Sequence, residues 1–254
     1  FPLEVMMSSK LAGEWKSYST SEFLDAVDQA SRGLLELGVK PGDKIALISH
    51  NNRCEWNIMD HALLQIGAID VPIYPTMTEA DYEYIFNHSE SSYCFVSNDE
   101  LYHKVSNVLD KCPDMKKVFS FEQYEGMNHW SEVTSLGDSS ARQEEVNSIR
   151  DNIKPQDMAT IIYTSGTTGL PKGVMLSHSN LTTTVIASTP RIPGLVKGKA
   201  KALSFLPVCH SFERFIQYLY MYNGASIYFA EAIETIKADL NYTQPAIFLS
   251  LIHI

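Results

Sequence analysis

Helical and strand patterns alternate along most of the chain, and this alternation limits the fold more than any other feature of the sequence. Ser19 and Glu22 form a capping box that opens the first helix, and Gly38 ends it. Further helices are predicted at residues 53–65, 79–87 and 100–109, with strands at 44–49, 69–73, 93–97 and 117–121. Because helices follow strands in turn, the sequence predicts an α/β fold in which helices pack on mostly parallel sheets.

The polar segment 122–157 interrupts this rhythm, and it is predicted to hold one helix near residues 141–150 in a surface excursion. The alternation then resumes with strands predicted at 158–163, 174–176, 203–206 and 225–229. Ser177 and Asn180 are typical of a helix start, so His178 between them is expected to have a structural role.

Composition and charge exclude several classes of function. The chain has 254 residues, of which 44% are hydrophobic and 20% charged, as in ordinary globular proteins. A net charge of −10 argues against a nucleic-acid partner, and no apolar run is long enough to span a bilayer. The cysteines lack a C-x-x-C spacing, which predicts free thiols in the cytoplasm; they are Cys54, Cys94, Cys112 and Cys209.

The run Tyr163-Thr164-Ser165-Gly166-Thr167-Thr168-Gly169-Leu170-Pro171-Lys172-Gly173 concentrates groups that bind phosphate. Glycine exposes backbone N–H groups, serine and threonine supply hydroxyls, and Lys172 supplies a mobile cation. We call residues 163–173 the phosphate loop. The residues expected to contact phosphate are Thr164, Ser165, Gly166, Thr167, Thr168, Gly169 and Lys172.

Two common nucleotide-binding patterns do not fit the phosphate loop. A Walker loop places its lysine directly after the last glycine and starts a helix at once, whereas Lys172 comes three residues after Gly169 and a strand is predicted next. A dinucleotide fingerprint fails as well, because no G-x-G precedes the glycines. The loop lies between two apolar runs, which predicts a hairpin-like clamp.

Four other segments resemble motifs of one family, and they occur along the chain in the same order as in that family. They are Tyr18-Ser19-Thr20-Ser21-Glu22-Phe23, Gln65-Ile66-Gly67-Ala68-Ile69-Asp70-Val71-Pro72, Leu176-Ser177-His178-Ser179-Asn180-Leu181 and Leu206-Pro207-Val208-Cys209-His210-Ser211-Phe212-Glu213. Together they resemble the AMP-forming acyl-CoA synthetases of the adenylate-forming superfamily. The Pro72-Ile73-Tyr74-Pro75-Thr76 and His210-x-x-Glu213-Arg214 variants resemble the long-chain fatty-acid–CoA ligase branch.

This resemblance implies ATP-dependent activation of a fatty acid to an acyl-adenylate and then to acyl-CoA, with ATP, Mg²⁺ and CoA as cofactors. It implies that the phosphate loop binds the β- and γ-phosphates of ATP and that the Thr164 hydroxyl lies near Mg²⁺. A fatty-acid substrate is compatible with peripheral membrane contact by a cytoplasmic enzyme. The fold is then part of the large N-terminal domain of an adenylate-forming enzyme.

His210 is the candidate catalytic residue. Its L-P-x-x-H segment follows a predicted strand, and parallel sheets bind ligands at the carboxyl ends of their strands. The resemblance implies that this position borders the acyl pocket and the α-phosphate, whereas the alternative is a buried structural histidine. Glu213 is expected to cap the following helix or to pair with Arg214, not to bind metal.

Residues 1–248 are expected to form an incomplete AMP-binding domain. The family's Y-G-x-T-E and T-G-D segments, its hinge and its C-terminal domain with a reactive lysine are absent from these 254 residues. We therefore expect the chain to be inactive alone. Residues 249–254, Leu-Ser-Leu-Ile-His-Ile, are the translation of the transposon-adapter sequence CTGTCTCTTATACACATC, so this tail is expected to be non-native.

Three other functions stay open at this point. An enzyme that adenylates an aryl or amino acid would use the same phosphate loop. A P-loop NTPase or kinase would release ADP, not AMP, and the position of Lys172 argues against it. A non-catalytic remnant would bind nucleotide without turnover.

Overall fold

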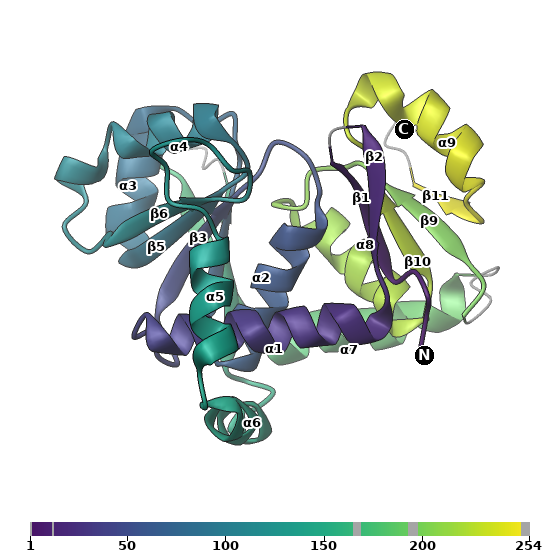
Figure 1. The fold of residues 1–254 in the computed structure, drawn as a ribbon, viewed down its shortest axis with the longest axis horizontal. Coiled ribbons are helices and arrows are strands. Elements are labelled where there is room, and N and C mark those ends of the chain that lie inside the picture. The colour runs from purple at the N-terminus through teal and green to yellow at the C-terminus, as the bar shows by residue number, and fades with distance from the viewer. Residues whose placement is uncertain (1, 12, 165–168, 193–197, 250–254) are drawn as a thin grey trace. The chain divides into compact units, whose positions relative to one another are not determined.

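The computed structural model describes residues 2–11, 13–164, 169–192 and 198–249. Within this part of the chain, the strands form one sheet of six strands and one of five (Figure 1). The contacts divide the chain into two compact units, each of which contains one sheet. The six-stranded unit comprises Ala26–His50 and Glu55–Ser179, and the five-stranded unit comprises Phe1–Asp25, Asn51–Cys54 and Asn180–Ile254.

The six-stranded sheet has the order β6-β5-β3-β4-β7-β8. Its strands are β3 (Lys44–Ile48), β4 (Ile69–Ile73), β5 (Ser91–Val96), β6 (Lys117–Ser120), β7 (Met158–Thr164) and β8 (Lys172–Ser177). Neighbouring strands are parallel except for β7 and β8, which are antiparallel. Every residue of β4 is buried, as expected for a parallel strand covered on both faces.

The helices of this unit connect its strands. They are α1 (Thr20–Glu36), whose first turns belong to the other unit, α2 (Cys54–Gln65), α3 (Glu79–Ser89), α4 (Asp99–Ser106), α5 (Ser131–Ser139) and α6 (Gln143–Asn152). The predicted capping box at the start of α1 is confirmed. The Ser19 N–H donates to Glu22 Oε2 at 2.7 Å, and the Glu22 N–H donates to Ser19 Oγ at 3.2 Å.

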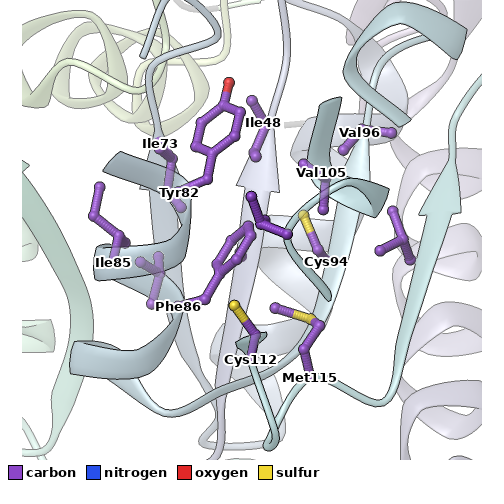
Figure 2. Packing of buried hydrophobic residues seen from close by; sticks show 14 of the residues in the cluster. Ile48, Ile73, Tyr82, Ile85, Phe86, Cys94, Val96, Val105, Cys112 and Met115 are labelled. Atoms are coloured by element: carbon purple, nitrogen blue, oxygen red, sulfur yellow. The ribbon is translucent and has the colours of Figure 1, made fainter. Parts of the chain in front are cut away.

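One hydrophobic core lies between the sheet and helices α3 and α4. Figure 2 shows Tyr82 and Phe86 of α3 beside the strand residues Ile48 and Cys94, with Val105 of α4 nearby. All five side chains are at most 1% exposed. The alternation of side chains along a strand explains this arrangement, because Cys94 and Val96 of β5 lie on the same face of the sheet.

The segment 122–157 contains two helices, so the prediction of a single helix there is wrong. Helix α5 was missed because glycine and hydroxyl side chains disfavour a helix in isolation. Its packing on α1 depends on two glycines. A Cβ added to Gly33 would lie 1.9 Å from the Val133 carbonyl oxygen, and one added to Gly137 would lie 1.9 Å from that of Gln29. Tertiary packing therefore outweighs the weak local preference.

The five-stranded sheet has the order β11-β9-β10-β1-β2. Its strands are β1 (Met7–Leu11), β2 (Glu14–Tyr18), β9 (Lys201–Ser204), β10 (Ser226–Phe229) and β11 (Ile247–Phe248), and its helices are α7 (His178–Ser188), α8 (Ser211–Tyr222) and α9 (Ile236–Thr243). Short 3₁₀ turns occupy Leu109–Lys111, Thr189–Arg191 and Ile233–Thr235. Only β2 runs antiparallel to its neighbour among these described strands, so the predicted class of helices on mostly parallel sheets is confirmed.

Strand β9 presents its side chains alternately to the two faces of the five-stranded sheet. Leu203 packs in a core that includes Tyr228 and Leu240, and Leu240 belongs to α9. The next residue, Ser204, faces Glu213 of α8 on the opposite side, as the period of two in a strand requires. The sheet is therefore covered by α9 on one face and by α8 on the other (Figure 1).

Candidate active site

The phosphate loop joins the antiparallel strands β7 and β8. Thr164 is the register partner of Lys172, and Tyr163 is the partner of Gly173. The two strands that flank the loop thus pair as a hairpin, as predicted. Ser165, Gly166, Thr167 and Thr168 lie outside the described residues.

Three of the residues expected to contact phosphate are described, and all three are exposed. Thr164 and Lys172 are exposed, as is Gly169, whose φ of +100° is a conformation that glycine adopts and that L side chains rarely do. Pro171 is buried and anchors the returning strand. The hairpin therefore presents a hydroxyl and an ammonium group on paired positions, accessible to an anion.

Tyr163 fixes the base of the loop. Its ring is 2% exposed, and its hydroxyl lies 2.7 Å from Nδ1 of His88 on α3. Burial, with a smaller contribution from Tyr84, raises the pKa of Tyr163 to about 12, so the phenol stays protonated. A Cβ on Gly173 would lie 2.8 Å from Ile161 Cγ2 and 3.3 Å from Tyr163 Cζ, so a glycine is needed where β8 begins.

Thr164 lies at the carboxyl end of β7, and β7 runs parallel to β4. Ligands of α/β sheets bind at this edge. The element after Lys172 is a strand and not a helix, which separates this hairpin from a Walker loop. A depression of about 470 Å³ in the same unit lies at the opposite edge, near Ile69 and Met158 where β4 and β7 begin.

His210 is the N-cap residue of α8, in the five-stranded unit. Its Nδ1 accepts a hydrogen bond of 3.1 Å from the Phe212 N–H, and its side chain is exposed. The alternative of a buried histidine is therefore wrong. Because Nδ1 accepts a hydrogen bond, the hydrogen of the neutral ring is assigned to Nε2, which leaves Nε2 as a donor.

Glu213 neither caps α8 nor pairs with Arg214, so that expectation is wrong. Its side chain is 3% exposed, and Oε1 accepts hydrogen bonds from Ser204 Oγ at 2.5 Å and from Gln217 Nε2 at 3.3 Å. Burial raises the pKa of Glu213 to about 7, against the opposing effect of these two donors. The Arg214 guanidinium instead donates from Nε to the Tyr218 hydroxyl at 2.8 Å.

Asn52 contacts the same strand end, although sequence reasoning assigned it no role. Its segment, Asn51–Cys54, belongs to the five-stranded unit. Asn51 donates to the Glu231 carbonyl after β10, and Asn52 contacts Ser204 and the residues after β9. No local signal in the sequence reveals these contacts, because the partners lie about 150 residues downstream.

The predicted metal ligand Thr164 is a single exposed hydroxyl. In the part of the chain that the structure describes, no three His, Cys, Asp or Glu side chains are grouped to hold a metal ion. Mg²⁺ prefers oxygen ligands and often takes only one or two from the protein, with the rest from phosphates and water. The hydroxyl therefore fits a magnesium ion that arrives with a nucleotide. Among the described helices, none is long and apolar enough to cross a membrane.

The described fold is that of an α/β protein with an exposed hairpin at the carboxyl end of a parallel strand. The sequence profile of the AMP-binding enzyme family matches residues 4–252. The chain belongs to the AMP-binding enzyme family.

Curated relatives agree with this assignment, and a solved structure shares the fold. A long-chain-fatty-acid–CoA ligase of Mycobacterium bovis is 29% identical over 98% of this chain and 41% of its own length. Long chain acyl-CoA synthetase 5 of Arabidopsis thaliana is 32% identical over 93% of this chain and 37% of its own length. The crystal structure of a long-chain-fatty-acid–CoA ligase from Archaeoglobus fulgidus shares the fold, with a TM-score of 0.78, 24% identity, and coverage of 96% of this chain and 47% of that one. The chain thus spans less than half the length of these proteins.

Proposed function

We propose that this chain is part of a long-chain fatty-acid–CoA ligase that forms AMP. A fatty-acid carboxylate oxygen attacks the α-phosphorus of ATP, the bond to the β-phosphate oxygen breaks, and pyrophosphate leaves. The CoA thiol then attacks the acyl carbon, loses its proton and displaces AMP. The observation that carries this proposal is the phosphate loop on the β7–β8 hairpin, with Thr164 and Lys172 paired across the strands at the carboxyl end of β7.

Both reactants of the first step are anions, so the protein must hold negative charge and orient the leaving group. The exposed Lys172 ammonium is suited to the β- and γ-phosphates, together with the hydroxyls and N–H groups of the loop. The Thr164 hydroxyl would bind Mg²⁺, and the ion would neutralise phosphate charge when it is bound with ATP. Tyr163, fixed through His88, holds the strand that carries Thr164.

The geometry of His210 supports a donor role instead of a base. Its Nδ1 is already used in capping α8, so Nε2–H is the group it can offer to a substrate oxygen. In the proposed reaction this donor would stabilise an oxygen of the carboxylate or of the α-phosphate as negative charge shifts. If Nδ1 took up a proton, it could no longer accept the hydrogen bond from the Phe212 N–H that caps α8. This further argues against proton abstraction by Nδ1.

The first experiment measures the reaction catalysed by a full-length protein containing this chain. We expect ATP–pyrophosphate exchange that depends on a long-chain fatty acid, with AMP as the nucleotide product. Exchange with aryl or amino acids instead would favour the other adenylating enzymes, and ADP would indicate an NTPase or kinase. Nucleotide binding without exchange would favour a non-catalytic remnant. Thr167→Ala should abolish exchange and leave the circular-dichroism spectrum unchanged.

A pair of variants separates capping by His210 from its chemistry. Asparagine is a good N-cap, so His210→Asn should keep the stability of α8 but lose the Nε2–H donor. His210→Ala should lose both. Equal loss of adenylate formation in the two variants, with lower thermal stability only in His210→Ala, is the expected result. Wild-type activity in His210→Asn would show that His210 acts only as a cap.

The 254 residues by themselves should not form acyl-CoA, because the family's adenine- and ribose-binding segments and its reactive lysine are not in them. Acyl-CoA production by this chain alone would contradict this statement. We further propose a cytoplasmic enzyme with peripheral membrane contact. The four cysteines are buried and form no disulfide, which supports a reducing compartment.

A further inference from the structure

We propose that Asn52 is a positioning residue that holds the loop carrying His210, through a buried hydrogen-bond network with Ser204, Glu213 and Gln217. We call residues 205–210 the His210 loop. The inference rests on the proposed role of His210, but its structural part concerns only contacts within the five-stranded unit.

The Asn52 side chain binds the His210 loop at two backbone positions. Nδ2 donates to the Leu206 carbonyl oxygen at 2.8 Å, and Oδ1 accepts from the Val208 N–H at 3.1 Å. A backbone carbonyl only accepts and a backbone N–H only donates, so the orientation of the amide is fixed by its partners. The Asn52 amide thus pairs with the backbone on both sides of Pro207, as the backbone of a neighbouring strand would.

Ser204 connects this amide to α8. Its Oγ accepts from Asn52 Nδ2 at 2.7 Å and from Gln217 Nε2 at 3.1 Å, and it donates to Glu213 Oε1 at 2.5 Å. The hydroxyl thus uses its one hydrogen and both lone pairs. All four side chains of the network are at most 5% exposed. In such an environment, removal of one partner leaves another polar group unsatisfied, so the network holds one arrangement.

The network controls the place of His210 from both ends. Asn52 holds the loop before it, and Glu213 and Gln217 hold the first turns of the helix after it. Within the loop, the His210 N–H donates to the Pro207 carbonyl oxygen at 2.9 Å, directly between the two backbone groups that Asn52 binds. A shift of the 206–208 backbone would therefore move His210 and its Nε2–H.

The experiment compares Asn52→Ala with the matched control Asn51→Ala in the full-length protein. Asn51 is the neighbouring residue with the same side chain, but it donates to the Glu231 carbonyl after β10 instead of to the His210 loop. We expect kcat for adenylate formation to fall about 10- to 100-fold in Asn52→Ala, with KM for ATP within about twofold, because small displacements of catalytic groups cost rate. Asn51→Ala should keep kcat within about threefold.

A second measurement does not depend on activity. Nitrogen NMR of labelled histidine should show His210 with hydrogen on Nε2 in the wild type and in Asn51→Ala, and a mixture of tautomers in Asn52→Ala. If the wild type lacks adenylation but this tautomer shift occurs, the proposed function fails and the positioning role stands. If the enzyme is active and Asn52→Ala matches Asn51→Ala in kcat and in NMR, the positioning role is wrong.

Asn52→Ala could lose folded structure through its unsatisfied partners, so Ser204→Ala provides an independent test. It cuts the link to α8 but keeps both Asn52 contacts with the loop backbone. We expect an intermediate loss of kcat, between those of Asn51→Ala and Asn52→Ala, and rescue in Ser204→Thr, which restores the hydroxyl. The proposal would be overturned if the loss of kcat in each variant were explained by its loss of thermal stability. The four variants compared are Asn51→Ala, Asn52→Ala, Ser204→Ala and Ser204→Thr.

Discussion

The phosphate loop and the His210 loop both follow strands of largely parallel sheets, but they are held in different ways. The phosphate loop is fixed at its ends by the β7–β8 pairing, and Thr164 and Lys172 face solvent. The His210 loop is held at Leu206 and Val208 by the buried side chain of Asn52, which comes from a distant part of the chain. One loop therefore exposes its chemistry on a local hairpin, whereas the other depends on tertiary contacts.

This difference separates stability from activity. Exposed groups on a hairpin contribute little to folding, so their substitution should change binding and catalysis alone. Buried polar groups such as Asn52 and Ser204 contribute to both, because their hydrogen bonds form only in the folded arrangement. Four substitutions test this contrast.

Lys172→Ala should have the largest effect, on activity. Loss of a charged donor to phosphate should lower adenylate formation about 100- to 1000-fold, as removal of one preorganised donor does in other enzymes. The free energy of unfolding should change by less than about 0.5 kcal/mol, since the side chain is exposed. The control Lys154→Ala, another exposed lysine of the same unit, should alter neither quantity. If Lys172→Ala unfolded at a urea concentration well below the unfolding midpoint of the wild type, the statement that this exposed side chain serves activity and not stability would be wrong.

Glu213→Gln should change the dependence of stability on pH. The carboxyl pKa is about 7 in the folded protein and ordinarily 4.5, so the folded state holds the proton more tightly. Its contribution to stability is complete below pH 4.5 and is lost as the pH rises through 7. Because glutamine does not titrate, the variant should gain up to about 3 kcal/mol relative to the wild type between pH 4.5 and pH 8. Urea denaturation at several pH values measures the difference, and a constant difference would contradict the assignment.

Gly173→Ala should destabilise the base of the phosphate loop by about 1 to 3 kcal/mol. The new methyl group would lie 2.8 Å from Ile161 Cγ2, which must move within a packed interior. Thermal denaturation provides the measurement. Ala159→Gly, which removes a buried methyl group from the paired strand β7, provides the comparison for this variant. Unchanged melting of Gly173→Ala would show that the Tyr163 and Ile161 side chains adapt freely.

Gly169→Ala should destabilise the fold only slightly, by about 1 kcal/mol. Among the described residues other than its chain neighbours, no atom lies within 4 Å of the added Cβ, so the φ of +100° is what opposes the change there. Adenylate formation should nevertheless be lost, because the position shapes the loop that we propose to bind phosphate. A variant with wild-type activity would show that this loop tolerates another backbone conformation. Relative to its loss of stability, Gly169→Ala should therefore lose much more activity than Gly173→Ala.

Much of the fold could be predicted from sequence, because the period of apolar residues and the caps are local. The capping box of Ser19 and Glu22 and the strand at residues 69–73 were predicted and are confirmed. Helix α5 was not predicted, since its formation depends on packing of Gly137 against α1. The β1–β2 hairpin was also missed, because only Met7 and Ser8 of β1 are fully buried and the strands lack a continuous apolar pattern.

The sequence by itself identified the family and a candidate phosphate loop, because in this chain the candidate donors are contiguous and their order is legible in eleven residues. It also located His210 after a strand. Only the tertiary structure decided that Nδ1 of His210 caps α8, that Glu213 is buried beside Ser204, and that Asn52 binds the loop. The hydrogen bonds of Asn52 join residues about 150 positions apart, and their geometry exists only once residues 51–54, the end of β9 and helix α8 are packed together in the five-stranded unit.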